Sequence, residues 1–133
     1  MTFVMLNPAK ATAQDNDQTI SKCIGFAERL DKDTLNVVNL YAYCTSYQQE
    51  LYAQSDMVGP ANQRWLSQTL RQSDLIVCAW GKLEDNQATN RLKRIVRRYQ
   101  LDLFCLGINQ DGSPKHPARL GYQRSLIPYT LEQ

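Results

Sequence analysis

The chain lacks long apolar runs. Its longest apolar stretch is residues 75–80, far short of the roughly 18 residues that a membrane-spanning helix needs. Residues 1–6 contain neither the basic segment nor the small-residue cleavage site of a secretory signal, and they are predicted to form a strand. The sequence therefore predicts a protein with no membrane partner.

The motifs of several enzyme classes are also missing. The chain has no G-x-x-x-x-G-K-[ST] phosphate loop, no G-x-G-x-x-G dinucleotide motif and no G-x-S-x-G nucleophile elbow. His116 is the single histidine, and no pair of carboxylates has the spacing of metal ligands. We therefore expect neither a metal ion nor a cofactor.

Closely spaced cysteine pairs are absent as well. Cys23, Cys44, Cys78 and Cys105 form no C-x-x-C motif, and a zinc site would need the fold to gather all four thiols or to add carboxylates. Buried free thiols in a reducing compartment are the simpler interpretation. We therefore expect a cytoplasmic protein.

The composition is that of one ordinary domain. Of the 133 residues, 43% are apolar and 21% are charged, which is enough to bury a core without disulfides or metal ions. We predict a single domain over residues 1–133. Fifteen basic and thirteen acidic side chains give a net charge of +2, which neither requires nor excludes a polyanionic partner. The pattern predicts no particular oligomeric state.

Apolar runs alternate with helical patterns along the chain. This alternation predicts a three-layer α/β/α fold with a central, mostly parallel four-stranded sheet. Residues 41–59 form a long irregular stretch, which is typical of functional loops, and the tail from Asp111 is expected to be an ordered surface segment. The predicted strands are 2–6, 35–40, 75–80 and 101–106. The first predicted helix is capped at Asp17, and its predicted buried residues are Ile20, Cys23, Ile24, Ala27 and Leu30. The second starts at Pro60 and is predicted to bury Trp65, Leu66 and Leu70, and the third covers 90–99.

Open parallel sheets bind ligands outside the carboxyl ends of their strands. The residues that follow the predicted strands include carboxamides, which read donor–acceptor edges, and aromatic rings, which stack on bases. This set favours a nucleobase or nucleotide as the ligand. The residues concerned are Asn7, Pro8, Lys10, Asn39, Tyr41, Tyr43, Trp80, Gly81, Asn109, Asp111, Lys115, His116 and Arg119.

Several of these residues also have a structural interpretation. Asn7, which precedes a proline, fits a turn that ends a strand. Asn39 fits a structural hydrogen bond within an apolar strand, and His116 fits an exposed loop histidine. Tyr41 and Tyr43 fit a cap on the edge of the core. The shared location of these residues, and no single spacing, carries the functional interpretation.

One face of the predicted helix over 90–99 is strongly basic. Such a face is most often simply solvated. Its cations are Arg91, Lys93, Arg94, Arg97 and Arg98.

Short motifs follow one another in order along nearly the whole chain. They are Met5-Leu6-Asn7-Pro8, Cys23-Ile24-Gly25-Phe26-Ala27, Val37-Val38-Asn39-Leu40-Tyr41-Ala42-Tyr43, Val58-Gly59-Pro60-Ala61-Asn62, Ala79-Trp80-Gly81, Cys105-Leu106-Gly107 and Gly112-x-Pro114-Lys115-His116-Pro117. Together these motifs resemble a bacterial and phage domain-of-unknown-function family, numbered 1643. Two departures from the family pattern occur, at residues 9–12 after the first motif and at Ala118-Arg119 after the last.

That family is in turn more distantly similar to the uracil-DNA glycosylase superfamily, which has the same order of motifs. The resemblance implies a glycosylase-like fold in which Asn7 positions a water molecule and Asn39 reads the edge of the base. It implies that His116 donates a hydrogen bond to the base oxygen as negative charge develops there. It also implies that the Tyr41–Gly59 region and the Lys115–Arg124 segment face the nucleic acid backbone. From their placement at the strand ends we expect a base-binding group of Pro8, Tyr41, Tyr43, Trp80 and Gly81, and we expect backbone contacts from Lys10, Lys115, Arg119 and Arg124.

We therefore expect a glycosylase-like protein that binds a nucleobase or nucleotide and hydrolyses an N-glycosidic bond in DNA or in a nucleotide. The alternatives are a non-catalytic nucleotide- or nucleic-acid-binding domain and a phage or bacterial interaction protein. The first interpretation fails if Asn7, Asn39 and His116 do not converge on one cavity. If they converge, but Asn7→Ala leaves ligand binding intact and no turnover is seen, the non-catalytic domain is favoured.

Overall fold

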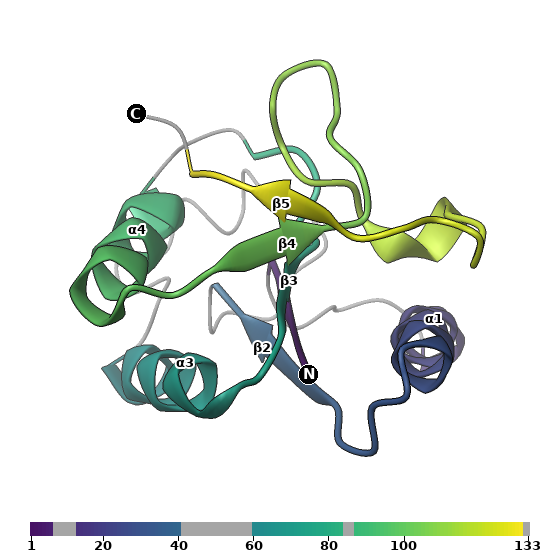
Figure 1. Cartoon of the computed structure of the whole chain (residues 1–133), viewed down its shortest axis with the longest axis horizontal. Helices are drawn as coiled ribbons and strands as arrows, with labels where there is room; N and C mark the ends of the chain where they lie inside the picture. The colour runs from purple at the N-terminus through teal and green to yellow at the C-terminus, as the bar shows by residue number, and fades with distance from the viewer. Residues whose placement is uncertain (7–12, 41–59, 84–86, 132–133) are drawn as a thin grey trace.

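The computed structural model describes residues 1–6, 13–40, 60–83 and 87–131 (Figure 1). It is a mixed α/β structure, as the alternating sequence pattern predicts. In chain order its elements are β1 (Thr2–Met5), α1 (Ala13–Arg29), β2 (Asn36–Asn39), α3 (Pro60–Gln72), β3 (Ile76–Cys78), α4 (Gln87–Tyr99), β4 (Leu103–Cys105), a 3-10 turn η1 (Pro117–Arg119) and β5 (Ile127–Tyr129).

The five strands form one sheet in the order β2-β1-β3-β4-β5. β2, β1, β3 and β4 are parallel, and β5 pairs with β4 in the antiparallel direction. The chain moves outward from β1 to β2 and then crosses to β3 on the other side of β1. The carboxyl ends of β1 and β3 therefore form the topological switch point, where doubly wound sheets bind ligands.

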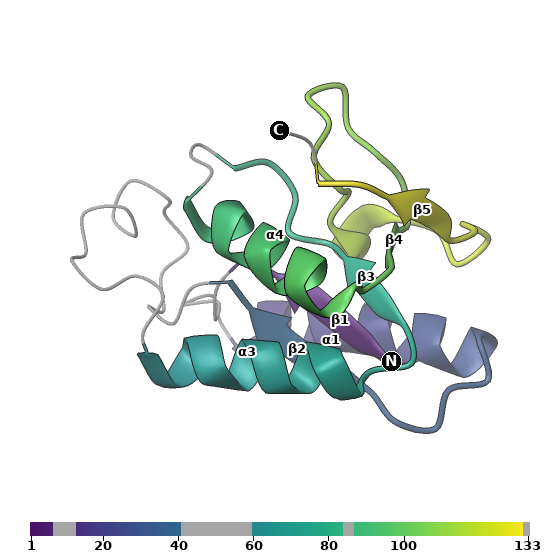
Figure 2. The same ribbon diagram turned by 60° about the vertical axis from the view of Figure 1, so that its left-hand side comes forward.

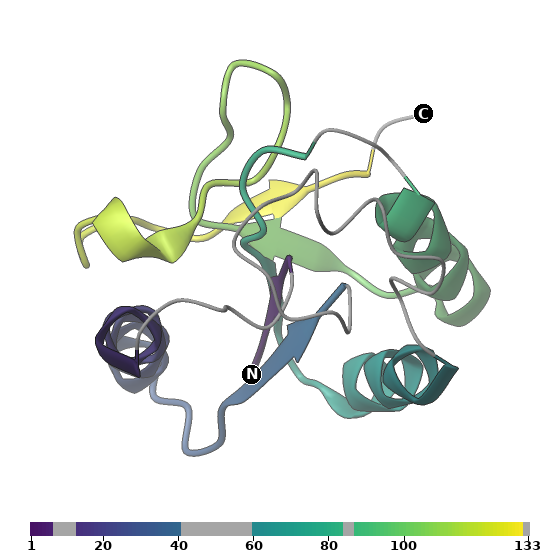
Figure 3. The ribbon, with the colours of Figure 1, turned by 180° about the vertical axis from the view of Figure 1, so that it is seen from behind.

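Helices cover both faces of the sheet. α1 and the segment around η1 lie on one face, and α3 and α4 lie on the other (Figures 1 and 3). Successive strand residues serve opposite faces, because side chains alternate along a strand. Phe3 packs with Phe26 of α1, whereas Val4 packs with Leu66 and Leu92 of α3 and α4. The core thus has two halves, one under each helical layer.

The prediction of four strands is wrong by one, because the tail supplies β5. This strand has only three residues and contains Pro128, so its apolar run is too short to stand out in the sequence. Proline lacks the N–H of a central strand and is tolerated at an edge. Pro128 is exposed at the outer strand of the sheet. The tail is therefore partly an edge strand and not only a surface segment.

The predicted inward face of α1 is also partly wrong. Cys23 and Ala27 are buried as predicted, but Ile20 is 39% exposed and Ile24 is 44% exposed. Leu30, also predicted to be buried, lies beyond the end of α1 and is 37% exposed. The residue that joins the buried pair is Phe26, whose large ring buries more area than an isoleucine side chain. Phe26 therefore rotates the buried stripe away from the isoleucines.

A similar correction applies to α3. Leu66 and Leu70 are buried, as predicted, but Trp65 is 51% exposed. Leu66 and Leu70 are four residues apart and share one face of the helix. Trp65 lies about 100° around the helix from Leu66, so its indole faces outward.

No helix among the described residues is long and apolar enough to cross a membrane.

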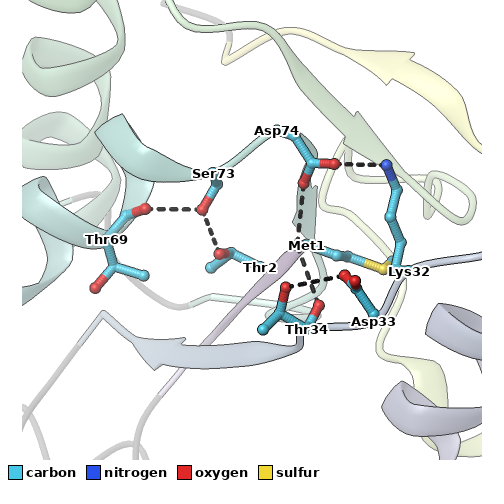
Figure 4. Close-up of polar contacts among 8 residues, drawn as sticks. All are labelled: Met1, Thr2, Lys32, Asp33, Thr34, Thr69, Ser73 and Asp74. Carbon is cyan, nitrogen blue, oxygen red and sulfur yellow. Dashed lines mark hydrogen bonds and ion pairs between the residues drawn. The ribbon is translucent and has the colours of Figure 1, made fainter.

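A network of polar contacts joins three segments at the amino ends of the strands (Figure 4). Asp74 accepts hydrogen bonds from the Lys32 Nζ at 2.6 Å and from the Met1 amino group at 3.1 Å. These two cations lower the pKa of Asp74 to about 2. Nearby, Ser73 donates to the Thr69 carbonyl at 2.7 Å, so the Thr2 hydroxyl is left to donate to Ser73. The network ties β1 to the ends of α1 and α3.

We predict that Asp74→Asn removes an acid-dependent part of the stability. The pKa of Asp74 is about 2 in the folded chain and 3.8 without its partners. Its carboxylate therefore stabilises the fold above about pH 4, and this contribution is lost as the pH falls towards 2. Urea unfolding at neutral pH and near pH 3 should show that the variant loses less stability on acidification than the parent chain. Asp102→Asn, at an exposed site, is the control. An equal acid dependence in the parent and in Asp74→Asn would contradict the assignment.

Candidate functional site

The site is built first on the end of β3. Beyond Cys78 the chain continues through Ala79 and Trp80 to Gly81, whose φ is 76°. The Gly81 N–H donates to the Pro114 carbonyl at 2.9 Å. A Cβ on Gly81 would lie 3.7 Å from the Cβ of His116. The single histidine of the chain therefore lies against the backbone at the switch point.

The loop after β4 is held by its own hydrogen bonds. The Asn109 N–H donates to the Ser113 carbonyl at 2.8 Å, and Asp111 Oδ1 accepts from the Ser113 N–H at 3.0 Å and from its hydroxyl at 2.6 Å. Tyr129 of β5 donates its hydroxyl to the Gly112 carbonyl at 3.1 Å. The loop projects beyond the sheet edge in Figure 2. Asn109 and Asp111 thus shape this loop, and the Ser113 donors hold the pKa of Asp111 below its usual value.

Two cations lie against Gly107, which directly follows β4. Gly107 is buried, with φ at 150°. A Cβ there would lie 2.7 Å from Arg124 Nη1 and 2.9 Å from Lys115 Cδ. Lys115 Nζ donates to Asn109 Oδ1 at 3.0 Å, and Arg124 Nη1 donates to the Leu106 carbonyl at 3.5 Å. The bare glycine backbone is what allows both side chains to approach the strand end.

We call the group of Gly81, Gly107, Lys115, His116 and Arg124 the strand-end cluster. The two ends of the loop join its halves, because the Lys115 N–H donates to the Gly107 carbonyl at 2.9 Å while Pro114 accepts from Gly81. The cluster therefore combines one imidazole and two cations on two glycine backbones, beside the switch point.

His116 is the N-cap of η1, and this role fixes its chemistry. Its Nδ1 accepts a hydrogen bond from the Ala118 N–H at 3.2 Å. Although His116 is exposed, packing removes part of the hydration of its ring, and this desolvation lowers its pKa. Protonation would also place a hydrogen on Nδ1, opposite the Ala118 donor. The imidazole is therefore neutral at pH 7 and presents an N–H at Nε2.

The other predicted site residues have different positions. Asn39 ends β2 in register with Met5 of β1, so it lies at the same edge of the sheet. Trp80 is only 4% exposed and packs edge to face on Tyr129, with ring centroids 5.9 Å apart. Its indole belongs to the core and is not open to a base in this structure. Arg119 is exposed in η1, the turn that packs against α1.

Five predicted site residues lie outside the described residues. These are Asn7, Pro8, Lys10, Tyr41 and Tyr43. The convergence of Asn7 with Asn39 and His116 is therefore still a prediction.

Sequence reasoning missed the part played by Gly107. In the sequence Gly107 stands out only as part of the Cys105-Leu106-Gly107 motif, although a glycine at the carboxyl end of a buried strand also indicates a close approach of other groups to the backbone. That signal was present in the sequence, and it identifies the residue on which Lys115 and Arg124 rest.

The described cysteines are free and buried, as predicted. Burial raises the pKa of the Cys23 thiol to about 12 and raises those of Cys78 and Cys105 as well. These thiols are protonated at pH 7 and are not nucleophiles. Cys44 lies outside the described residues. Within the described ranges, no three His, Cys, Asp or Glu side chains gather as metal ligands would.

The doubly wound sheet and the strand-end cluster define an α/β domain with a candidate ligand site at its switch point. Residues 1–118 match the family described as "Protein of unknown function (DUF1643)", and the chain belongs to that family, which confirms the first resemblance of its motifs. No curated protein and no solved structure matches the chain. The match includes Lys115 and His116 and ends before Arg119, Arg124 and β5.

We predict that Gly107→Ala destabilises the chain more than Gly112→Ala does. Both glycines have positive φ, so each alanine costs about 1–3 kcal/mol of backbone strain. A Cβ at Gly112 meets nothing within 4 Å, whereas at Gly107 it meets both cations of the cluster. Urea unfolding of the two variants measures the difference. An equal or smaller loss for Gly107→Ala would contradict the close packing on Gly107.

We also predict that His116 titrates below its ordinary pKa of 6.5, with the neutral form carrying its proton on Nε2. Because the chain has a single histidine, NMR of the imidazole ring gives an unambiguous titration curve. The folded state favours neutral His116, so its contribution to stability is present above about pH 6.5 and is lost as the pH falls through the folded pKa. A midpoint above that of the urea-unfolded chain, or a neutral form protonated on Nδ1, would contradict the cap.

Proposed function

We propose that the protein binds a nucleobase or nucleotide at the strand-end cluster and acts on its N-glycosidic bond. The observation that supports this proposal is the gathering of His116, Lys115 and Arg124 on two glycine backbones beside the switch point. A neutral N–H donor suits a base carbonyl oxygen, and two adjacent cations suit a phosphate. A nucleotide is a ligand that carries both groups.

The chemistry of His116 agrees with this proposal. In hydrolysis a water oxygen attacks the sugar C1′, the bond from C1′ to the base nitrogen breaks, and the electron pair leaves with the base. The departing base gains negative charge and finally takes up a proton. A donor fixed at its carbonyl oxygen stabilises the transition state. The Nε2 N–H of His116 fills that role without needing a charge of its own.

One observation favours the alternative, a domain that binds without catalysis. His116 cannot act as a general base, because Nδ1 is occupied by the Ala118 N–H and Nε2 carries the proton. Asp111 is bonded to Ser113 within its own loop. Positioning of the water therefore depends on Asn7, whose amide can orient a water molecule but is a poor base.

Release of free base from oligonucleotides tests the proposal. The panel contains uracil and bulky modified pyrimidines in single-stranded and double-stranded DNA and in free nucleotides. We expect the parent chain to release base and the Asn7→Ala/His116→Ala double variant to release none. Asp102→Asn, an exposed carboxylate change, is the matched control and should keep full activity.

Binding of the same panel separates the two candidates. Binding without release, lost in Lys115→Ala/Arg124→Ala, would move the assignment to the non-catalytic domain. No binding to any member of the panel would contradict both candidates.

A further inference from the structure

A groove separates α3 from α4 on the face of the sheet away from α1. The two helices lie side by side in Figures 1 and 2. The groove has a volume of about 320 Å³, and four arginines line it: Arg64 from α3, and Arg91, Arg94 and Arg98 from α4. We call it the arginine groove. It is separate from the strand-end cluster, with which it shares no residue.

The two helices hold nearly half of the basic side chains of the chain. Together α3 and α4 contain seven arginines and lysines and no acidic residue. The rest of the chain has eight basic against thirteen acidic side chains, a net charge of −5. The overall charge of +2 therefore conceals a concentration of basic side chains in these two helices. A segregated field of this kind attracts anions to one side of a molecule.

The groove arginines lack acidic partners in the part of the chain that the structure describes. The ion pairs of Asp74 with Lys32 and with the Met1 amino group do not involve a groove arginine. Like charges gathered without counterions repel one another, and a bound anion relieves that repulsion. The groove thus has the electrostatics of a binding site for an anion.

The arrangement favours an extended anion over a compact one. Arg91, Arg94 and Arg98 recur about once per helical turn, and so form a row about 10 Å long down α4. The row ends at Tyr99, whose ring has the Arg71 guanidinium 4.4 Å and the Arg98 guanidinium 5.5 Å from its centroid. A linear row of cations matches a chain of phosphates better than a single phosphate group.

An exposed aromatic ring points to the kind of polymer. Trp65 follows Arg64 on α3 and is 51% exposed. Trp65 does not line the groove, because it lies about 100° around α3 from Arg64. Its exposed indole is a flat surface on which an unpaired base of a strand that crosses α3 can stack. An acidic protein segment would use the arginines but would have no comparable use for the indole.

We propose that the arginine groove binds the phosphate backbone of single-stranded nucleic acid, with Trp65 stacking on a base. This inference goes beyond the proposed function, because it assigns a second surface and makes the ligand a polymer. It does not depend on hydrolysis or on the strand-end cluster.

Fluorescence anisotropy with a labelled oligothymidylate tests the proposal. The test variant Arg94→Gln/Arg98→Gln removes two charges from the groove. The matched control, Lys22→Gln/Arg29→Gln, removes two charges from α1, on the other face of the sheet, and leaves the ion pair of Lys32 with Asp74 intact. At about 0.1 M salt we expect the test variant to bind roughly tenfold more weakly. The slope of log affinity against log salt should fall by about 1.4, because each neutralised phosphate contributes about 0.7. The control should keep both values.

Tryptophan fluorescence gives a second measurement. Trp80 is buried and Trp65 is exposed, so quenching by the oligonucleotide should disappear in Trp65→Leu. Equal binding by the groove variant and the control would overturn the proposal. Competition by polyglutamate as strong as that by the oligonucleotide would also overturn it and would indicate an acidic protein partner. Binding of a mononucleotide by the groove variant reports on the strand-end cluster separately, so failure of one site is distinguishable from failure of the other.

Discussion

The candidate site depends on the way the loop after β4 returns to the sheet. Two backbone hydrogen bonds hold it there: Gly81 donates to Pro114, and Lys115 donates to Gly107. They clamp the loop across the ends of β3 and β4 and so set the position of His116. Both anchoring residues on the sheet are glycines with positive φ, a conformation that other residues adopt only with strain. The geometry of the cluster is therefore a property of the backbone first and of the side chains second.

The cationic groups of the chain fall into two settings with different physical consequences. The first setting has only two cations, Lys115 and Arg124, which lie close to the backbone. Lys115 donates a hydrogen bond to Asn109, and Arg124 donates one to the Leu106 carbonyl, which suits the positioning of one small ligand. The arginine groove is open and forms a row, which suits a long ligand of repeating charge. A nucleic acid strand held along α4 and a nucleotide held at the strand ends are compatible, because the two surfaces share no residue.

The sequence predicts the four parallel strands well, because β1, β3 and β4 lie in apolar runs and β2 has the apolar pair Val37 and Val38 at its centre. The sequence predicts less well which side chains of a strand or helix enter the core. Trp80 is the last residue of the predicted strand 75–80, and the strand-end rule therefore places it at the ligand edge. Side-chain alternation continues past β3, however, so that Cys78 and Trp80 enter one half of the core and Val77 and Ala79 enter the other. The buried face of α1 was misplaced because Phe26, and not Ile20 or Ile24, enters the core. The strand β5 was missed because it is short and contains Pro128. The strand-end rule did place Lys115 and His116 correctly at the edge, whereas the contact of Arg124 with Gly107 needed the fold.

The central claim is that the strand-end cluster is the ligand site, and NMR of the isotope-labelled protein with an added pyrimidine nucleoside monophosphate tests it most directly. The account predicts that the amide signals of Gly81 and Gly107 and the ring signals of His116 shift together, with one binding curve. It also predicts that these shifts are lost in Lys115→Ala/Arg124→Ala. Shifts confined to α3 and α4, or no shift at the three cluster residues, would contradict it.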